Sequence, residues 1–402
     1  MKNKILILGA GPAGLFLALS LKERGFTDFL ILEKEPTAGG LCRSAEVDGG
    51  PLDIGGGHIL DVRRPQVNER LFSFLPETEW NIFDRKTKIR IPGYEIGYPF
   101  ESHIWQLPEE EQLAYLESIA HAGCLQGTPM PEKFTAWIEW KLGKMIAETY
   151  MLPYNGKIFS GHLDELGTYW LYKLPDVSFR EVLKSCLRHA PFGLLPGHAR
   201  FFYPQKYGFG EVFLRIADSL KKHILYETPV TSVDWKSATV NQTFEAELIV
   251  NTIPWCEFAD SLPEEVRQDV AALKYASVDI DYFDHGEETT DSHWTYCADP
   301  GLAYHRLLHR NNFAPGTRGY WTETNSLRAK APGKFHFRNK YAYPLNTIDK
   351  PRRIARILAW HRSHRIIGLG RWGEWEHMNS DAAMLKGMEL AKKICDNGIS
   401  AL

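Results

Sequence analysis

The stretch "KILILGAGPAGLFLALSLKERG", residues 4–25, decides the fold. It begins with an apolar run, turns through Gly9, Gly11 and Gly14, and continues with apolar residues in a helical pattern. A second apolar run, "FLILEKE" at 29–35, follows. In such a βαβ unit the G-x-G-x-x-G pattern makes a tight turn and places a pyrophosphate at the helix N-terminus. The sequence therefore predicts a Rossmann-like dinucleotide-binding domain.

Glu33 closes the second predicted strand, where an acid accepts hydrogen bonds from an adenosine ribose. An acid at this place favours an unphosphorylated 2′-hydroxyl, which suits FAD or NAD better than NADP. The glycine pattern alone is also typical of an ordinary strand-to-helix turn. Because the strand, helix, second strand and acid all fall where the motif requires them, dinucleotide binding is the better interpretation.

Composition excludes several classes of protein. The 402 residues include 47 basic and 50 acidic side chains, a formal net charge of -3, so we expect no nucleic-acid partner. The six cysteines lack metal-ligand spacing and disulfide-scaffold density, which predicts no metal site and a reducing cytoplasm. No apolar run is long enough to cross a bilayer, so we expect no membrane span.

A second glycine-rich motif, "EKEPTAGGLCRS" at 33–44, contains Gly39, Gly40 and Arg43. It resembles the second fingerprint of the FAD amine oxidase superfamily, in which this segment runs along the pyrophosphate and the ribityl chain. The resemblance implies FAD as the cofactor.

Two later segments resemble further strands of the same FAD-binding domain. "YETPVTSVDW" at 226–235 resembles the strand whose backbone, here at Val230, meets the adenine. "ELIVNTIPW" at 247–255 resembles a returning strand of the sheet. The predicted FAD domain is therefore discontinuous in sequence.

Residues 53–61, "DIGGGHILD", place three glycines directly before His58. This segment resembles the histidine loop of the UDP-galactopyranose mutase family, which lies against the flavin and moves with its redox state. The resemblance implies that Gly57 and His58 contact the cofactor and that His58 is catalytic. From the residues alone, a glycine turn with a structural histidine is an equal alternative.

The segments "IGYPFESHIWQLPEEEQ" at 96–112 and "FTAWIEWKLGKMIAETYMLPYNGKIF" at 134–159 resemble the nucleotide-binding part of the same family. The second is predicted to be a helix ending in "PYN". An aromatic stripe packed in a core is the plainer interpretation of its tryptophans. The resemblance implies a substrate-binding set that stacks on the base or reads its edge: Tyr98, Tyr154, Asn155 and Phe159, the last in place of a tryptophan.

"HWTYCADPGLAYHRLLHRNNFAP" at 293–315 resembles the family's Trp-x-Tyr and following arginine. It implies that Trp294 and Tyr296 bind substrate and that Arg306 bridges the diphosphate, since a guanidinium fork matches phosphate oxygens. Tyr343 resembles a phosphate-binding tyrosine.

"GLGRWGEWEHMNSDAAMLKG" at 368–387 resembles the family's last motif. It implies that Gly370 and Arg371 lie near the flavin and that a helix starting near Asn379 aims its N-terminus at the cofactor. His377 stands where bacterial members have a phosphate-contacting tyrosine.

Another departure from the family is Lys173, which stands in place of an arginine. Lysine and histidine can still bind phosphate, so these departures leave the nucleotide and the sugar open.

The resemblance implies an isomerase. Its reaction interconverts the pyranose and furanose forms of a nucleotide-diphosphate sugar through attack of reduced-flavin N5 on the anomeric carbon. Arg306, Arg371 and Lys173 would support the departing diphosphate. The chain has no second complete G-x-G-x-x-G unit, so transient NAD(P)H or another donor would reduce the FAD. The oligomeric state is open, a homo-oligomer included.

Two alternatives remain. One is a net oxidoreductase of the amine oxidase, protoporphyrinogen oxidase or desaturase type, because these enzymes share the N-terminal fingerprints. The other is a flavin-binding protein that has lost catalysis. The joint presence of "YPF", "PYN", "WTY" with Arg306, and "GRWGEW" favours the mutase.

The expected architecture is α/β, with a doubly wound Rossmann-like FAD domain, a helical insertion and a sheet-containing substrate domain. We expect the FAD domain to comprise residues 1–94, 201–254 and 346–402, the mainly helical insertion 95–200, and the substrate domain 255–345.

Overall fold

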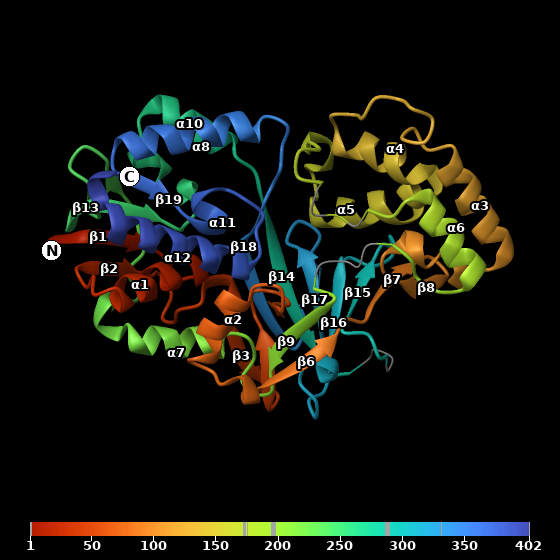
Figure 1. Cartoon of the computed structure of the whole chain (residues 1–402), viewed down its shortest axis with the longest axis horizontal. Helices are drawn as coiled ribbons and strands as arrows, with labels where there is room; N and C mark the ends of the chain where they lie inside the picture. Colours follow the sequence, from red (N-terminus) through yellow and green to blue (C-terminus); the bar gives the residue numbers. More distant parts are fainter. Residues whose placement is uncertain are drawn as a thin grey trace.

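A mainly parallel sheet forms one half of the computed structural model, which describes residues 2–171, 174, 176–193, 198–285, 290–330 and 332–401 (Figure 1). Neighbouring strands run in the order β10 (Ile224–Leu225), β2 (Phe29–Leu32), β1 (Lys2–Leu8), β13 (Phe244–Asn251), β12 (Thr239–Val240) and β11 (Val233–Asp234), with β19 (Ile366–Gly368) also paired to β13. The pairs of β1 with β2 and β13, and of β13 with β19, are parallel. The predicted Rossmann-like α/β fold is confirmed.

Successive residues of β1 enter different cores because strand side chains alternate between the two faces of a sheet. Ile5 and Ile7 pack into a cluster with residues of α1 (Pro12–Glu23), α7 (Glu211–Ser219) and α12 (Ser380–Asn397). Leu6 and Leu8 pack into another with residues of α8 (Glu264–Ala272) and α10 (Lys350–Ser363). Figure 1 shows α8 and α10 above the sheet and α1 and α7 below it. A strand segment covered on both faces is apolar at every position, as the buried segment Ile5–Leu8 of β1 is.

A second, mostly antiparallel sheet forms the middle of the molecule (Figure 1). Its strand order is β18 (Phe335–Pro344), β14 (Tyr275–Phe283), β17 (Tyr320–Asn325), β16 (Arg306–His309), β15 (Trp294–Cys297), β7 (Thr87–Ile91) and β8 (Tyr94–Gly97). Smaller sheets pair β3 (Ser44–Val47) with β4 (Gly50–Asp53), and β9 (Arg200–Pro204) with β5 (Leu60–Asp61) and β6 (Trp80–Asp84). The strands β7 and β8 therefore belong to this sheet, although β7 lies within the 1–94 stretch expected in the FAD domain and β8 continues into the expected helical insertion.

The third part is helical and lies at the far side of the second sheet (Figure 1). It contains α3 (Glu109–Ala120), α4 (Phe134–Ile146), a π-helical turn (Ala147–Met151), α5 (Leu152–Ile158) and α6 (Phe179–Arg188). The prediction of one helix over 134–159 was wrong in detail. Gly143 has φ 78°, which breaks the regular helix at this residue. A Cβ there would lie 2.5 Å from the carbonyl oxygen of Ser118, so the position requires glycine. Three shorter helices lie elsewhere in the chain: α2 (Pro65–Phe72), α9 (Arg310–Phe313) and α11 (Gly370–Gly373).

The prediction of a continuous strand over 226–235 was also wrong. Residues 226–232 form no strand, and only Val233–Asp234 pairs in the sheet as β11. In this stretch, Thr228 donates its backbone N–H to Glu33 O at 2.9 Å, just after the end of β2. Within the described residues, no helix has the length and apolar character needed to cross a membrane.

Candidate active site

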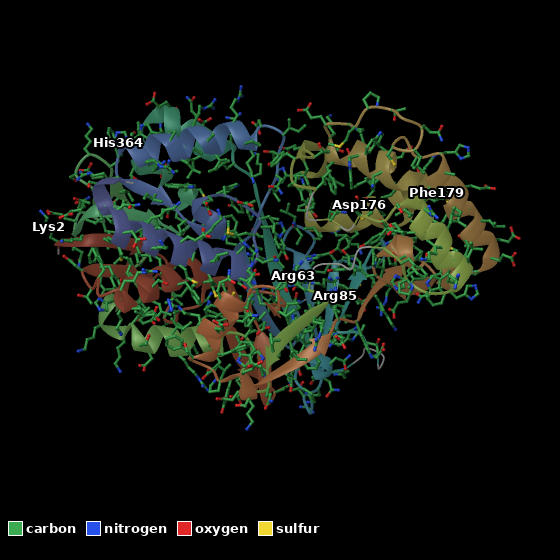
Figure 2. All side chains as sticks on the ribbon, viewed as in Figure 1. Lys2, Arg63, Arg85, Asp176, Phe179 and His364 are labelled. Atoms are coloured by element: carbon green, nitrogen blue, oxygen red, sulfur yellow. The ribbon has the colours of Figure 1, made fainter. Side chains whose placement is uncertain are left out.

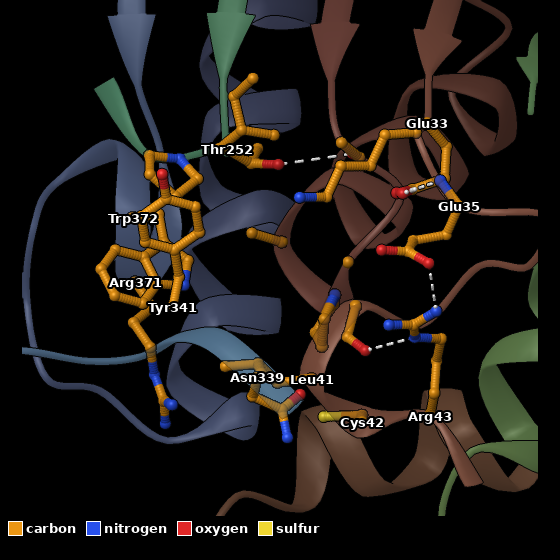
Figure 3. A pocket seen from close by; sticks show the side chains of 18 of the residues that line it. Glu33, Glu35, Leu41, Cys42, Arg43, Thr252, Asn339, Tyr341, Arg371 and Trp372 are labelled. Carbon is orange, nitrogen blue, oxygen red and sulfur yellow. Dashed lines mark hydrogen bonds and ion pairs between the residues drawn. The ribbon is translucent and has the colours of Figure 1, made fainter. Parts of the chain in front are cut away.

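A cavity of about 270 Å³ lies at the carboxyl ends of β1, β2 and β13 (Figure 3). Gly9 and Gly11 line it after β1, Glu33 after β2, and Thr252 after β13. Ligands of open parallel sheets bind at this edge, where the strand order reverses and helices begin. The sequence therefore folds its glycine motif directly into the wall of the cavity.

The glycines of both motifs are explained by close backbone packing. A Cβ on Gly14 would lie 2.1 Å from the carbonyl oxygen of Gly9, so α1 can pack against β1 only without a side chain at Gly14. A Cβ on Gly40 would lie 3.2 Å from Gly11 Cα, which brings the second motif against the first. Gly39, with φ 111°, makes the turn into that contact. The cradle is narrow, as a pyrophosphate site requires.

Glu33 is a buried carboxylate on the wall of this cavity. Its Oε2 accepts the N–H of Ala10 at 2.7 Å, and its Oε1 accepts the N–H of Glu35 at 3.0 Å. Burial raises the pKa of Glu33, and these two backbone hydrogen bonds oppose that shift. Arg43 Nη1 donates to Glu35 Oε2 at 2.9 Å and also lines the cavity. The fixed carboxylate oxygens retain lone pairs that can accept ribose hydroxyls.

A second cavity, of about 220 Å³, meets the first. The residues that line both cavities are His58, Arg371, Asn379 and Ser380. Asn379 is the N-cap of α12, so the predicted helix start near this residue is confirmed. The paired arrangement suits a long cofactor in the first cavity whose reactive end faces a ligand in the second.

His58 is held by the loop between β4 and β5. Its Nδ1 lies 2.8 Å from Gly56 O, and because a carbonyl only accepts, Nδ1 carries the proton. Burial, followed by the charge of Arg371, lowers the pKa of His58 to about 4, so the imidazole is neutral at pH 7. A Cβ on Gly57 would lie 2.1 Å from Leu308 Cδ2, which explains why this loop has no side chain there.

Arg306 and Glu323 form a two-point ion pair on the second cavity. Arg306 Nε donates to Glu323 Oε2 at 2.8 Å, and Nη2 donates to Oε1 at 2.6 Å. Glu323 Oε1 also accepts the N–H of Gly57 at 2.8 Å. Burial raises the pKa of Glu323, but the charge of Arg306 and the hydrogen bonds outweigh it, so the pKa is far below its usual range. One carboxylate thus ties the arginine to the histidine loop.

Arg371 is a buried cation where the two cavities meet. Its Nε and Nη2 donate to Met378 O at 3.0 and 2.7 Å, and Nη1 donates to Ala342 O at 3.0 Å. Burial lowers its pKa, yet a guanidinium remains protonated at neutral pH. Because carbonyl partners carry no net charge, the positive charge of Arg371 persists beside the cavities.

Aromatic side chains and a further arginine complete the second cavity. Trp294, Tyr296, Tyr343 and His377 line it, as does Arg85 from the segment before β7. The Arg85 guanidinium lies 4.9 Å from the Trp294 ring centroid, and its Nη2 donates to the Tyr296 hydroxyl at 3.3 Å. The rings of Tyr343 and His377 lie 5.1 Å apart. The wall can therefore offer several hydrogen-bond donors to an anion.

The family model and the sequence relatives described here match a part of the chain, and the family model matches the part that contains the first glycine motif. A family model described as an NAD(P)-binding Rossmann-like domain matches residues 7–77. An uncharacterized protein from the nifH2 3′ region of Methanothermococcus thermolithotrophicus is 50% identical over 52 residues, 13% of this chain and 49% of that protein. A Baeyer-Villiger monooxygenase of Pseudomonas aeruginosa is 34% identical over 88 residues, 22% of this chain and 15% of that protein. The chain spans about half or less of the length of these curated relatives.

Solved structures match the whole chain. A crystal structure of reduced UDP-galactopyranose mutase superposes with a TM-score of 0.88 at 20% identity, covering 100% of this chain and 98% of that one. The chain has the fold of UDP-galactopyranose mutase. Cyclohexylamine oxidase from Brevibacterium oxydans superposes less closely, with a TM-score of 0.66 at 15% identity over 98% of this chain and 99% of that one. The mutase resemblance is thus confirmed at the level of the fold, which oxidases share.

Within this mutase fold, four expected substrate residues lie outside the lining of both cavities: Tyr98, Tyr154, Asn155 and Phe159. The Tyr154 ring lies 5.2 Å from Tyr296, one layer behind the cavity wall. Asn155 is buried and its Nδ2 donates to Met151 O at 2.8 Å. Lys173 lies outside the described residues.

Most of the residues expected to bind the cofactor line one of the two cavities. Gly9, Gly11, Glu33, Gly40, Arg43, His58, Val230, Arg371 and Asn379 line the first cavity. Gly57 lines the second. Gly14, Gly39 and Gly370 lie behind the wall, and a Cβ on Gly370 would lie 2.6 Å from the Ala13 Cβ.

Sequence reasoning missed Glu323, Arg85 and His198, all of which line the second cavity. Glu323 is the cross-strand partner of Arg306 in the β16–β17 pair, so an alignment of those two strands could have found it. Arg85 and His198 reach the cavity from segments far apart in sequence, and no local pattern marks them.

Proposed function

We propose that the chain binds FAD in the first cavity and interconverts the pyranose and furanose forms of a nucleotide-diphosphate sugar in the second. The observation that carries this proposal is the charge of the second cavity. Arg85, Arg306 and Arg371 line it, with Glu323 as its only carboxylate among the described residues, and that carboxylate is already paired with Arg306. Such a wall suits a diphosphate and does not suit an organic cation or an apolar ring.

The residues of the first cavity fit FAD. The N-terminus of α1 and the close glycine contacts would hold the pyrophosphate, Glu33 the adenosine ribose, and the loop at Val230 the adenine. Arg371, Asn379 and His58 would contact the isoalloxazine end. Reduced FAD supplies an electron-rich atom that can attack an anomeric carbon and be displaced again, so an isomerisation needs no net oxidation.

The arginines would bind the diphosphate and stabilise the charge that develops as it leaves the sugar. Arg306 is oriented for this task by Glu323, and Arg371 by three hydrogen bonds to two backbone carbonyls. Tyr296, Tyr343 and His377 would donate further hydrogen bonds to phosphate oxygens. Lys173 remains a proposed additional cation.

Base recognition by Tyr98, Tyr154, Asn155 and Phe159 is part of the proposal. Tyr98 and Tyr154 both pack against Tyr296, with ring centroids at 5.3 and 5.2 Å. A base would reach them only if Tyr296 turned aside or the helical part shifted. We therefore infer that the ligand's base opens this layer when it binds. The three-part division proposed from the sequence would then place the base between the helical part and the second sheet.

The alternative function is a net FAD-dependent oxidoreductase, since the fold also matches cyclohexylamine oxidase. An anaerobic assay separates the two. The protein is reduced with dithionite and incubated with UDP-galactose and a panel of UDP-, GDP- and dTDP-sugars, and the products are resolved chromatographically. We expect one sugar to isomerise only with reduced protein. Failure with every sugar, together with flavin reduction by an amine, would establish the oxidoreductase instead.

A further inference from the structure

His198 and Asp61 form an ionisable pair beside the second cavity. His198 lies just before β9, with φ 60°, and lines the cavity. Its Nδ1 lies 3.1 Å from Asp61 Oδ2, and its Nε2 lies 3.0 Å from Asn379 Nδ2. The imidazole therefore connects a buried carboxylate to a residue shared by the two cavities.

Asp61 is ionised and accepts hydrogen bonds. It is 1% exposed, and Arg63 donates to its Oδ2 from Nε at 2.8 Å and from Nη2 at 2.5 Å. Burial raises the pKa of Asp61, but the hydrogen bonds from His198 and Arg63 outweigh burial, so the pKa is lowered. His198 Nδ1 faces this carboxylate at 3.1 Å, and because the Asn379 amide Nδ2 lies 3.0 Å from Nε2 and donates to it, the proton of His198 is on Nδ1.

With Nδ1 protonated, Nε2 is an acceptor, and the amide of Asn379 can donate to it. A buried aspartate beside the protonated Nδ1 leaves the other ring nitrogen able to exchange protons with a ligand that replaces the Asn379 amide. Figure 2 shows Arg63 and Arg85 at the centre of the molecule, between the Rossmann-like part and the helical part. Asp61 and Arg63 adjoin His198, and the other charged or titratable side chains on the cavity are His58, Arg85, Arg306, Glu323, Arg371 and His377.

We propose that His198, held by Asp61, transfers protons between oxygen atoms of the sugar bound in the second cavity. This inference rests on the proposed function. A pyranose-to-furanose interconversion breaks one ring C–O bond and forms another. The oxygen that leaves the ring gains a proton, and the hydroxyl oxygen that enters the ring loses one. Because Nε2 is unprotonated at rest, His198 takes the proton of the hydroxyl that enters the ring and gives a proton to the oxygen that leaves the ring, so one proton passes between the two oxygens and the imidazole ends the cycle in its starting state.

The pair of charges explains why Asp61 is needed. Asp61 Oδ2 lies 3.1 Å from Nδ1, and its negative charge balances the imidazolium while a proton is on Nε2. The nearby guanidinium groups of Arg85 and Arg371 oppose a second positive charge. Without Asp61 the ring would lose both its orientation and this compensation.

The test measures kcat, KM and the pH profile of kcat for isomerisation by the reduced holoenzyme. His198→Gln should lower kcat about 100-fold, within the range of general acid–base catalysis, with little change in KM. It should also change the pH profile of kcat, and added imidazole should restore part of kcat. The exposed His121→Gln is the matched control and should behave as wild type. Asp61→Asn should lower kcat without imidazole rescue.

The outcomes separate the two proposals. If wild type isomerises a sugar while His198→Gln keeps kcat within threefold and the same pH profile, the proton-transfer role is wrong and the proposed function stands. If wild type isomerises no sugar, the proposed function fails and this role fails with it. Flavin content and circular dichroism check folding. If His198→Gln loses its flavin, an unchanged pH profile in Asp61→Asn overturns the proposal.

Discussion

Arg306 and Glu323 face each other across β16 and β17 and share two hydrogen bonds, at 2.8 and 2.6 Å. The same carboxylate accepts the backbone N–H of Gly57 at 2.8 Å. The arginine proposed to bind the diphosphate and the loop that carries His58 are therefore joined through one residue. A shift of the histidine loop would change the position of the arginine, and the reverse holds as well.

Replacing Glu323 by Gln should weaken the anchoring of both Arg306 and the loop that carries His58. The amide keeps the size of the side chain but leaves the Arg306 charge without compensation, so we expect the free energy of unfolding to fall by about 3 kcal/mol. We expect kcat/KM to fall at least tenfold, because the guanidinium and the loop lose their common anchor. Thermal unfolding and steady-state kinetics measure these effects. The exposed Glu148→Gln is the control, and equal behaviour of the two variants would contradict the assigned role.

Replacing Gly14 by Ala should prevent flavin binding. The new Cβ would lie 2.1 Å from the carbonyl oxygen of Gly9 and would push α1 away from the turn of the first cavity. We expect the purified variant to contain less than a tenth of the wild-type flavin, measured by absorbance after denaturation. Gly156→Ala, whose nearest neighbour would be Leu163 Cδ2 at 3.9 Å, should keep its flavin. A yellow Gly14→Ala protein would refute this explanation of the motif.

Replacing Arg85 by Gln should weaken binding of a nucleoside diphosphate. The variant loses a charge-assisted hydrogen-bond donor of the second cavity, and such bonds contribute about 1.5–3 kcal/mol. We therefore expect the Kd for UDP to rise about 10- to 100-fold in calorimetry. Arg318→Gln, at a side chain that is 69% exposed, should leave the Kd unchanged. An unaltered Kd in Arg85→Gln would exclude Arg85 from the diphosphate site.

Buried His361 should make stability depend on pH. Burial lowers the pKa of His361 from 6.5 to about 4, so in the folded state the imidazole stays neutral while the unfolded chain takes up a proton. The stabilisation is complete above about pH 6.5 and is lost as the pH falls to about 4, by on the order of 3 kcal/mol. Urea unfolding at several pH values should show a weaker dependence in His361→Phe. The exposed His121→Gln should keep the wild-type slope, and an equal slope in all three proteins would contradict this cause.

The local parts of the fold were predictable from sequence. The alternation of Ile5, Leu6, Ile7 and Leu8 between two cores makes the second half of β1 apolar, and the glycine turn and helix follow directly. These signals depend on neighbours within a few residues. The break at Gly143 was not predictable in the same way, because the close approach of the Ser118 carbonyl, which requires glycine there, comes from another helix.

The site was only partly predictable for the same reason. Arg306 was singled out by a motif, whereas Glu323 becomes its partner only through the register of two strands. The pair of His198 and Asp61 is joined across 137 positions of sequence by tertiary structure alone, at 3.1 Å. The base-binding role of Asn155 stays a prediction, since this residue is buried, is bonded to Met151 O and lies outside the lining of both cavities.

The most direct test counts products per flavin. The protein is photoreduced once, excess reductant is removed under anaerobic conditions, and the nucleotide sugar identified in the panel is added. Isomerisation without net oxidation predicts many molecules of product for each flavin, with the flavin absorbance remaining that of the reduced form. At most one product per flavin, formed as the flavin reoxidises, would contradict a mutase and identify a net redox reaction.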